Sequence, residues 1–295
     1  MQHKGLNDIT MKNYLSLVKF SHTIFAMPFA LTGFFLAVSE GYSMSWKVFG
    51  LVILCMVFAR SAAMAFNRWL DRDIDAANPR TIIREIPAGI ISPGSALSFV
   101  IINSILFVAC TFFINPLCFA LSPVALAVIL GYSYTKRFTA LCHFVLGLGL
   151  ALAPVGAYLA VTGYFALAPV LLGATVLTWV SGFDVIYALQ DEGFDRSQQL
   201  HSVPVWLGRK NALRLSEGVH LLSALFMLSA VWQMQQNTPT GWLLWVGCGV
   251  FLAMLLYQHL IVKADDLSRV NLAFFTTNGI ASLVFGIMAV ADMLL

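Results

Sequence analysis

Residues 67–84 read Asn-Arg-Trp-Leu-Asp-Arg-Asp-Ile-Asp-Ala-Ala-Asn-Pro-Arg-Thr-Ile-Ile-Arg and directly follow a long apolar run. This stretch holds Asp71, Asp73 and Asp75 among four arginines. Charge at this density stands out in a chain that is 59% hydrophobic and only 11% charged. The segment therefore indicates the end of an apolar span and a candidate functional region directly after it.

A second acidic cluster lies further along the chain, at the end of another apolar run. It comprises Asp184, Asp191, Glu192 and Asp195. Together with Glu85, the two clusters contain eight of the fourteen acidic residues of the chain. This concentration predicts that the activity of the protein lies between the two clusters.

The composition excludes a soluble globular protein. The chain of 295 residues has a mean hydropathy of +0.83, and its charged fraction of 11% is far below the roughly 25% that is usual in soluble domains. Apolar stretches long enough to cross a bilayer core of about 30 Å recur along it. We therefore predict an all-α, polytopic membrane protein with a single domain over residues 1–295, surrounded by a lipid bilayer and without a nucleic-acid partner.

Nine membrane spans are predicted, each of them an apolar run bounded by turn-forming or charged residues. Their approximate bounds are 14–38, 46–70, 95–114, 117–134, 140–162, 165–189, 211–234, 240–262 and 271–293. The first run has no convincing small-residue cleavage site, so we expect it to be retained as a helix. The five cysteines lie in apolar spans without metal-type spacing, and we expect them to be buried free thiols.

Lysine and arginine are confined almost entirely to one side of the predicted spans. Fifteen of the seventeen lie at the N-terminal end or in the links after the second, fourth, sixth and eighth spans, and only Lys47 and Arg60 lie elsewhere. The positive-inside rule places the N-terminus and both acidic clusters at the cytoplasmic face, and we expect the membrane to be the cell (inner) membrane. With nine spans, the C-terminus falls on the opposite side.

Each acidic cluster contains a polar stripe, because residues four apart share one face of an α-helix. The first stripe is Asn67, Asp71 and Asp75, and the second is Tyr187, Asp191 and Asp195. The aspartates of the second stripe follow those of the first by the same interval of 120 residues (191 − 71 and 195 − 75). Two carboxylates one turn apart repel each other, and at a membrane boundary they are costly unless a cation joins them. These oxygen ligands suit Mg²⁺, which typically takes one or two carboxylates together with phosphate oxygens and water.

Basic residues close to both stripes would complete a diphosphate site. Lys136 and Arg137 lie in one link, and Arg80 and Arg84 lie in another. Such side chains bind phosphate oxygens through charge-assisted hydrogen bonds. The alternative is that the charges only solvate helix ends. A single pair of aspartates would fit that explanation, but two pairs on one membrane side, both surrounded by basic residues, favour a metal–diphosphate site.

Arg60 lies inside the second predicted span, seven positions before Asn67 and on the same helix face. An intramembrane arginine normally faces a cavity and has a partner. Two explanations remain open: a structural ion pair with Asp184, or a contact that orients an anionic acceptor such as an aromatic carboxylate. Lys19 and His22 could also reach the site, although a lysine at such a position more commonly extends its amine to the interface.

These motifs resemble those of the UbiA superfamily of intramembrane aromatic prenyltransferases. Residues 67–84 are similar to its first signature, Asn-x-x-x-Asp-x-x-x-Asp followed by Arg-Thr. Residues 184–195, which read Asp-Val-Ile-Tyr-Ala-Leu-Gln-Asp-Glu-Gly-Phe-Asp, are similar to its second. Residues 134–137, Tyr-Thr-Lys-Arg, are similar to the family's basic loop between helices four and five. The resemblance extends over essentially the whole chain.

The resemblance implies a nine-helix bundle that transfers a prenyl chain from a polyprenyl diphosphate to an aromatic acceptor, commonly a quinone precursor. It implies Mg²⁺ bound by Asn67, Asp71, Asp75, Asp191 and Asp195, of which the four aspartates form the catalytic set. The diphosphate-binding residues would be Arg68, Arg80, Arg84, Lys136 and Arg137. The acceptor-binding residues would be Arg60, Asp184 and Tyr187.

Two departures from the family pattern leave the acceptor open. Residues 84–87, Arg-Glu-Ile-Pro, stand where many 4-hydroxybenzoate-using relatives have Arg-Pro, and His201-Ser202 stands where Lys-Ser is common. These features resemble a branch labelled 4-hydroxybenzoate polyprenyltransferase, some members of which serve menaquinone synthesis by prenylating a dihydroxynaphthoate. An alternative of a different class is a secondary transporter. Transporters, however, place their polar groups near the membrane midplane beside broken helices, whereas here the charge gathers at one face.

Overall fold

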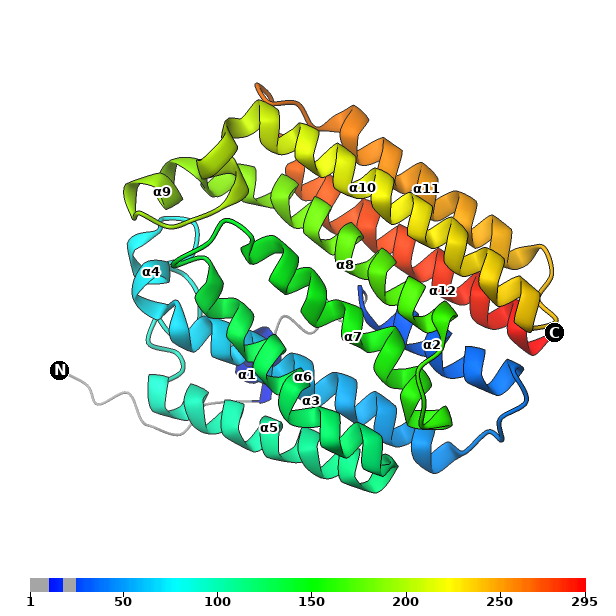
Figure 1. The fold of residues 1–295 in the computed structure, drawn as a ribbon. Coiled ribbons are helices and arrows are strands. Elements are labelled where there is room, and N and C mark those ends of the chain that lie inside the picture. Colours follow the sequence, from blue (N-terminus) through cyan, green and yellow to red (C-terminus); the bar gives the residue numbers. More distant parts are fainter. Residues whose placement is uncertain (1–10, 18–24) are drawn as a thin grey trace.

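The apolar runs of the sequence form long helices that lie side by side in the computed structural model (Figure 1). The structure describes residues 11–17 and 25–295, and within them it contains helices and no strand. The helices are α1 (Met11–Leu17), α2 (Met27–Ser39), α3 (Trp46–Leu70), α4 (Arg72–Ala77), α5 (Pro93–Ile114), α6 (Pro116–Thr135), α7 (Cys142–Thr162), α8 (Leu167–Ala188), α9 (Glu192–Ser197), α10 (Val203–Asn237), α11 (Leu243–Ile261) and α12 (Asn278–Leu294). A 3₁₀ turn (Leu189–Asp191) joins α8 to α9, and a π-helical turn (Leu272–Thr277) precedes α12.

The membrane architecture predicted from hydropathy is confirmed. Eight helices in the described part of the chain are long and apolar enough to cross a membrane, and they correspond to the second to ninth predicted spans. The second predicted span, 46–70, coincides with α3. The first, 14–38, differs, because it contains α1 and the α-helix α2 of only 13 residues. Residues 18–24, which include Lys19 and His22, lie outside the described residues.

Helix α10 is longer than the predicted span 211–234. It extends over 35 residues and begins with Val203, so its first turns include the charged pair Arg209 and Lys210. Those charges interrupt the apolar pattern from which the span was predicted. The backbone bends at Gly208, where φ is +74° and ψ is 162°, a conformation that is open to glycine and strained for other residues.

Aromatic side chains from three helices form the centre of the bundle. The ring centroid of Phe29 on α2 lies 5.4 Å from those of Trp179 on α8 and Phe285 on α12, and all three side chains are buried. Helix α8 also packs closely against α7, since a Cβ atom at Gly147 would lie only 2.4 Å from the carbonyl oxygen of Leu177. Small residues allow such close backbone approaches in membrane bundles.

Both acidic motifs lie at one end of the bundle, where the short helices α4 and α9 follow the long ones (Figure 1). The backbone leaves the α-helical conformation at Asp71 (φ −90°, ψ 7°) and at Asp191 (φ −100°, ψ 0°). The first stripe is therefore interrupted, although the N–H of Asp75 still donates to the carbonyl oxygen of Asp71 at 2.7 Å. Each motif thus has an aspartate directly before a short helix, α4 or α9, that follows a membrane helix.

Candidate active site

The carboxylate of Asp71 is almost fully buried and is surrounded by hydrogen-bond donors. Its Oδ1 accepts a hydrogen bond from Arg137 Nη2 at 2.8 Å, and its Oδ2 lies 3.0 Å from Lys136 Nζ. Asn67 Nδ2 donates to the same Oδ2 at 3.2 Å and to Ser133 Oγ at 3.4 Å. The first motif and the basic segment that follows α6 therefore form one cluster.

The Asp75 carboxylate is also buried, and its two oxygens differ. Oδ1 accepts a hydrogen bond from Arg84 Nη1 at 2.6 Å, whereas Oδ2 lies 3.9 Å from Arg68 Nη1. Within the described residues this Oδ2 is buried without a hydrogen bond. A buried carboxylate oxygen without a donor is unfavourable. The oxygen is therefore available to a cation.

Arg80 connects the first motif to the second. Its Nε donates to Asp191 Oδ1 at 3.0 Å and its Nη2 contacts Asp191 Oδ2, so the pair is bidentate. Its Nη1 donates to the hydroxyl of Tyr187 at 2.9 Å. Partial burial alone would lower the pKa of Arg80, but Asp191 and Tyr187 outweigh burial and hold that pKa above its ordinary value. The guanidinium therefore remains charged between the two motifs.

The remaining acidic residues of the second cluster have separate environments. Asp195 lies on α9, one turn beyond Asp191, and its carbonyl oxygen accepts a hydrogen bond from the N–H of Leu200 at 2.9 Å. The carboxylate of Glu192 lies 3.0 Å from Arg196 and 2.7 Å from Arg209. Glu192 is therefore occupied by surface ion pairs.

The carboxylates fit a divalent cation that is shared with a phosphate ligand. In the part of the chain that the structure describes, no three His, Cys, Asp or Glu side chains are grouped so that they could hold a metal ion by themselves. Mg²⁺ does not require such a group, because one or two carboxylates with phosphate oxygens and water are its usual ligands. Hard oxygen donors at Asp71 and Asp75, including the buried Oδ2 of Asp75, match this requirement.

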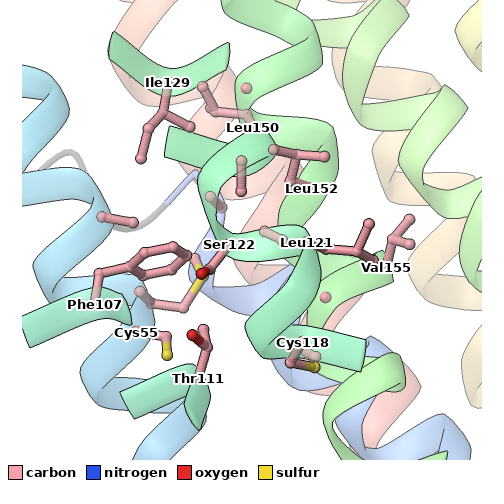
Figure 2. A pocket seen from close by; sticks show the side chains of 18 of the residues that line it. Cys55, Phe107, Thr111, Cys118, Leu121, Ser122, Ile129, Leu150, Leu152 and Val155 are labelled. Carbon is pink, nitrogen blue, oxygen red and sulfur yellow. The ribbon is translucent and has the colours of Figure 1, made fainter. Parts of the chain in front are cut away.

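An apolar cavity of about 350 Å³ lies among α3, α5, α6 and α7 (Figure 2). Arg60 and Tyr132 line it, and Tyr132 precedes Ser133, which is bonded to Asn67. One end of the cavity therefore adjoins the first motif. Two of its lining residues, Cys55 and Cys118, are among the five cysteines, all of them free as expected; Cys110 and Cys248 are buried and the other three are partly buried.

The three residues expected to bind an acceptor lie in different surroundings. Arg60 lines the apolar cavity. Asp184 Oδ2 lies 2.7 Å from Nδ1 of His143, so the ion pair considered between Arg60 and Asp184 is replaced by a pair with histidine. Tyr187 binds Arg80, and its ring centroid lies 4.1 Å from that of Phe274.

Three residues of the site escaped the sequence prediction. Tyr132 and Ser133 immediately precede the basic segment 134–137, and that position was the available signal for both. His143 is a buried histidine in the first turn of α7. An ionisable residue within a membrane span is a reason to expect a specific partner, but the sequence does not identify Asp184 as that partner.

The sequence is similar to known proteins over most of its length. Residues 26–280 match the sequence model of a family described as the UbiA prenyltransferase family. The 4-hydroxybenzoate octaprenyltransferase of Aliivibrio salmonicida is 30% identical over 246 residues, which cover 81% of this chain and 82% of that protein. The protein of the same description from Cupriavidus necator is 26% identical over 254 residues, which cover 86% of this chain and 87% of that protein.

The fold is similar to solved structures. The apo structure of a UbiA homolog from Aeropyrum pernix has a TM-score of 0.82 and 31% sequence identity, and the match covers 92% of this chain and 98% of that one. The structure of a UbiA homolog from Archaeoglobus fulgidus bound to DMAPP and Mg²⁺ has a TM-score of 0.71 at 20% identity, with 96% and 99% of the two chains covered. At that lower identity, the similarity concerns the fold alone.

Proposed function

The chain belongs to the UbiA prenyltransferase family, and from that premise we propose that it transfers a polyprenyl chain from a polyprenyl diphosphate to a 4-hydroxybenzoate-type aromatic acid during ubiquinone or menaquinone synthesis. The observation that carries the proposal is the bidentate contact of Arg80 with Asp191, which joins a basic residue of the first motif to a carboxylate of the second. The names of the relatives, 4-hydroxybenzoate octaprenyltransferases, support the choice of donor and acceptor. We further propose that residues 1–295 form a single integral-membrane domain.

Five oxygen-bearing residues would hold Mg²⁺ in this proposal. They are Asn67, Asp71, Asp75, Asp191 and Asp195, with the four aspartates as the catalytic set. When bound, Mg²⁺ would neutralise the diphosphate and make it a better leaving group. The buried position of the Asp71 and Asp75 carboxylates supports this role, because charges placed in advance in a water-poor site act strongly on a developing anion.

The basic residues of the site would bind the phosphate oxygens directly. We assign this role to Arg68, Arg80, Arg84, Lys136 and Arg137. Four of them contact Asp71, Asp75 or Asp191 at 3.0 Å or less, so their positions are fixed by the carboxylates before any donor binds. A donor diphosphate would take over some of these contacts, while the aspartates turn to the cation.

The apolar cavity would hold the prenyl tail and keep water from the reacting carbon. The C–O bond to the diphosphate breaks, the resulting allylic cation is attacked by an aromatic carbon, and the ring proton leaves with the diphosphate. Arg60 at the cavity wall would orient the carboxylate of the acceptor, and Asp184 and Tyr187 would complete the acceptor set. The lining of the cavity is otherwise almost wholly apolar, which suits a hydrocarbon chain and a short-lived cation.

The chain is a multi-pass membrane protein. We propose that it lies in the cell (inner) membrane with the end that carries α4 and α9 in the cytoplasm. The distribution of lysine and arginine supports this orientation.

Product formation by the purified protein tests the proposal. With Mg²⁺ and a polyprenyl diphosphate present, we expect transfer to 4-hydroxybenzoate, detected as a product whose mass equals that of the acceptor plus the prenyl group. A chelator should reduce transfer to background, and added Mg²⁺ should restore it, because four of the five bases assigned to the diphosphate are already paired with Asp71, Asp75 or Asp191. Transfer that persists in chelator would contradict the role of the metal.

The same assay distinguishes the acceptors. A dihydroxynaphthoate is supplied in a parallel reaction, and the acceptor with the higher kcat/KM is the one that the site prefers. Preference for the naphthoate would replace 4-hydroxybenzoate in the proposal and retain the chemistry. Absence of product with either acceptor, together with movement of a solute across proteoliposomes, would favour a transporter.

We expect Arg80→Gln to raise the KM for the polyprenyl diphosphate by about tenfold or more, because a charged hydrogen bond to phosphate is lost. The KM for the acceptor should change little. Initial rates with each substrate varied in turn provide the measurement. Arg196→Gln is the matched control, since Arg196 is also paired with an acid of the second cluster but its side chain is 60% exposed. Equal shifts in the two variants would count against a specific contact with the donor.

A further inference from the structure

His143 is a buried residue at the meeting point of three helices. It lies in the first turn of α7 and is 3% exposed. Its Nδ1 is 2.7 Å from Asp184 Oδ2 on α8, and its Nε2 is 3.3 Å from the backbone nitrogen of Val203 at the start of α10. A backbone N–H can only donate, so Nε2 must accept and the proton must lie on Nδ1. His143 therefore donates a hydrogen bond to Asp184.

The segment between α6 and α7 is fixed at this same meeting point. The N–H of His201, in the link before α10, donates to the carbonyl oxygen of Lys136 at 2.7 Å. At the other end of the segment, Asp184 on α8 accepts the hydrogen bond of His143 Nδ1 at 2.7 Å. The segment 136–143 is therefore held at its first residue by the α9–α10 link and at its last residue by α8.

This segment presents the two bases that contact the first motif. Lys136 Nζ lies 3.0 Å from Asp71 Oδ2, and Arg137 Nη2 lies 2.8 Å from Asp71 Oδ1. The other end of the segment contacts Asp184, the first residue of the second motif. The hydrogen bonds of His143 thus connect the bases that face one motif to the helix that carries the other.

We infer that His143 is a positioning residue, which holds segment 136–143 so that Lys136 and Arg137 are in place to receive the donor diphosphate. This inference rests on the function proposed above. Without the contact to Asp184, the end of the segment at α7 would loosen, and its two bases would have to be ordered when the diphosphate binds. Affinity for the donor would then fall. Affinity for the aromatic acceptor would fall less, because Asp184, which the proposed function places in the acceptor set, keeps its position on α8.

Two substitutions separate the two hydrogen bonds of His143. In His143→Asn the side-chain amide nitrogen occupies the place of Nδ1, so the donor to Asp184 is retained. In His143→Gln the amide lies at the place of Nε2, so an acceptor for the Val203 N–H is retained and the donor to Asp184 is lost. We expect His143→Gln to raise the KM for the polyprenyl diphosphate by about 10- to 100-fold, because two long side chains would then have to be ordered on binding. We expect His143→Asn to restore most of this loss.

Tyr158→Phe is the matched control, because Tyr158 lies near the other end of the same helix α7. Its hydroxyl donates to Glu40 Oε2 at 2.6 Å, so the substitution removes a contact of similar length between α7 and the residue that directly follows α2. The control should leave both KM values unchanged. A purely structural role for His143 would lower the melting temperature and the yield without a selective change in the KM for the donor.

The outcomes separate this inference from the proposed function. If the wild-type protein makes no prenylated product, the proposed function itself is overturned, and the role of His143 is overturned with it. If the wild type is active and His143→Gln shifts neither KM, or shifts both equally, the positioning role is overturned. Hydrogen exchange of the wild type without ligands provides a measurement that does not depend on the folding of a variant. Slow exchange of the backbone amides in residues 136–143 is expected, and exchange as fast as that of an open loop would overturn the inference.

Discussion

Asp71→Ala is expected to reduce prenyl transfer by about 1,000-fold, to near background, while the protein still inserts into the membrane. The size of the effect follows that of removing one preorganised electrostatic group from an active site, which is commonly 100- to 1,000-fold. Asp71 is only 2% exposed, and Lys136 and Arg137 both contact it. The substitution would remove a proposed metal ligand and leave Lys136 and Arg137 without their shared carboxylate. Asp191→Ala should behave similarly, because it removes the partner of Arg80.

The control for this experiment lies two residues away. The side chain of Asp73 is 88% exposed, and its Oδ2 lies 3.9 Å from Nη2 of Arg72. Asp73→Ala therefore removes a charge of the same kind, in the short helix α4 that begins directly after Asp71, and transfer should remain close to that of the wild type. Rates of product formation are compared at saturating substrates, with membrane insertion checked by extraction and size-exclusion chromatography. Near-normal activity of a well-inserted Asp71→Ala variant would contradict the assignment of a metal site.

Arg60→Gln is expected to raise the KM for the aromatic acceptor by about 10- to 100-fold, which corresponds to a charged hydrogen bond of about 1.5–3 kcal/mol. Arg60 lies on the wall of an almost wholly apolar cavity, so an acceptor carboxylate would gain strongly from its charge. The KM for the polyprenyl diphosphate should not change. Arg60→Lys should have an intermediate effect, since it keeps the charge but loses the bidentate geometry.

Lys47→Gln provides the matched control for Arg60. Lys47 also lies away from the charged end of the bundle, and it is exposed near the start of α3, the same helix that carries Arg60. Its removal should change neither KM. Loss of folded protein in both Arg60 variants would assign Arg60 a structural role. A folded Arg60→Gln variant with an unchanged acceptor KM would exclude the acceptor contact.

The membrane helices could be predicted from the sequence because length and hydropathy determine them directly. The bounds of α3 agree with the predicted span 46–70, since a polar cap at Ser45 and the charge beyond Leu70 mark both ends. The prediction was less accurate where a helix extends beyond its continuous apolar stretch. Residues 203–210 of α10 are helical, but Arg209 and Lys210 interrupt the apolar pattern there, so the span predicted from hydropathy began too late.

The residue types of the site could be read from the sequence, but their pairing could not. Arg80 and Asp191 are 111 residues apart, and His143 and Asp184 are 41 apart, so their contacts depend on how the helices pack. The break in the helix at Asp71 was also missed, because the spacing of four residues is compatible with an uninterrupted helix. Tertiary packing, which a single sequence does not encode locally, determined both features.

The bidentate contact of Arg80 with Asp191 also bears on how the enzyme finishes its cycle. Without substrates, the bases and carboxylates of the site form ion pairs with one another. Binding of the donor is then an exchange of ion partners, and its net gain is smaller than the number of charges would imply. After transfer, the carboxylates would form their ion pairs with the bases again, and this competition would favour release of the diphosphate. A site that bound this highly charged product without such internal competition would retain it and stop turning over.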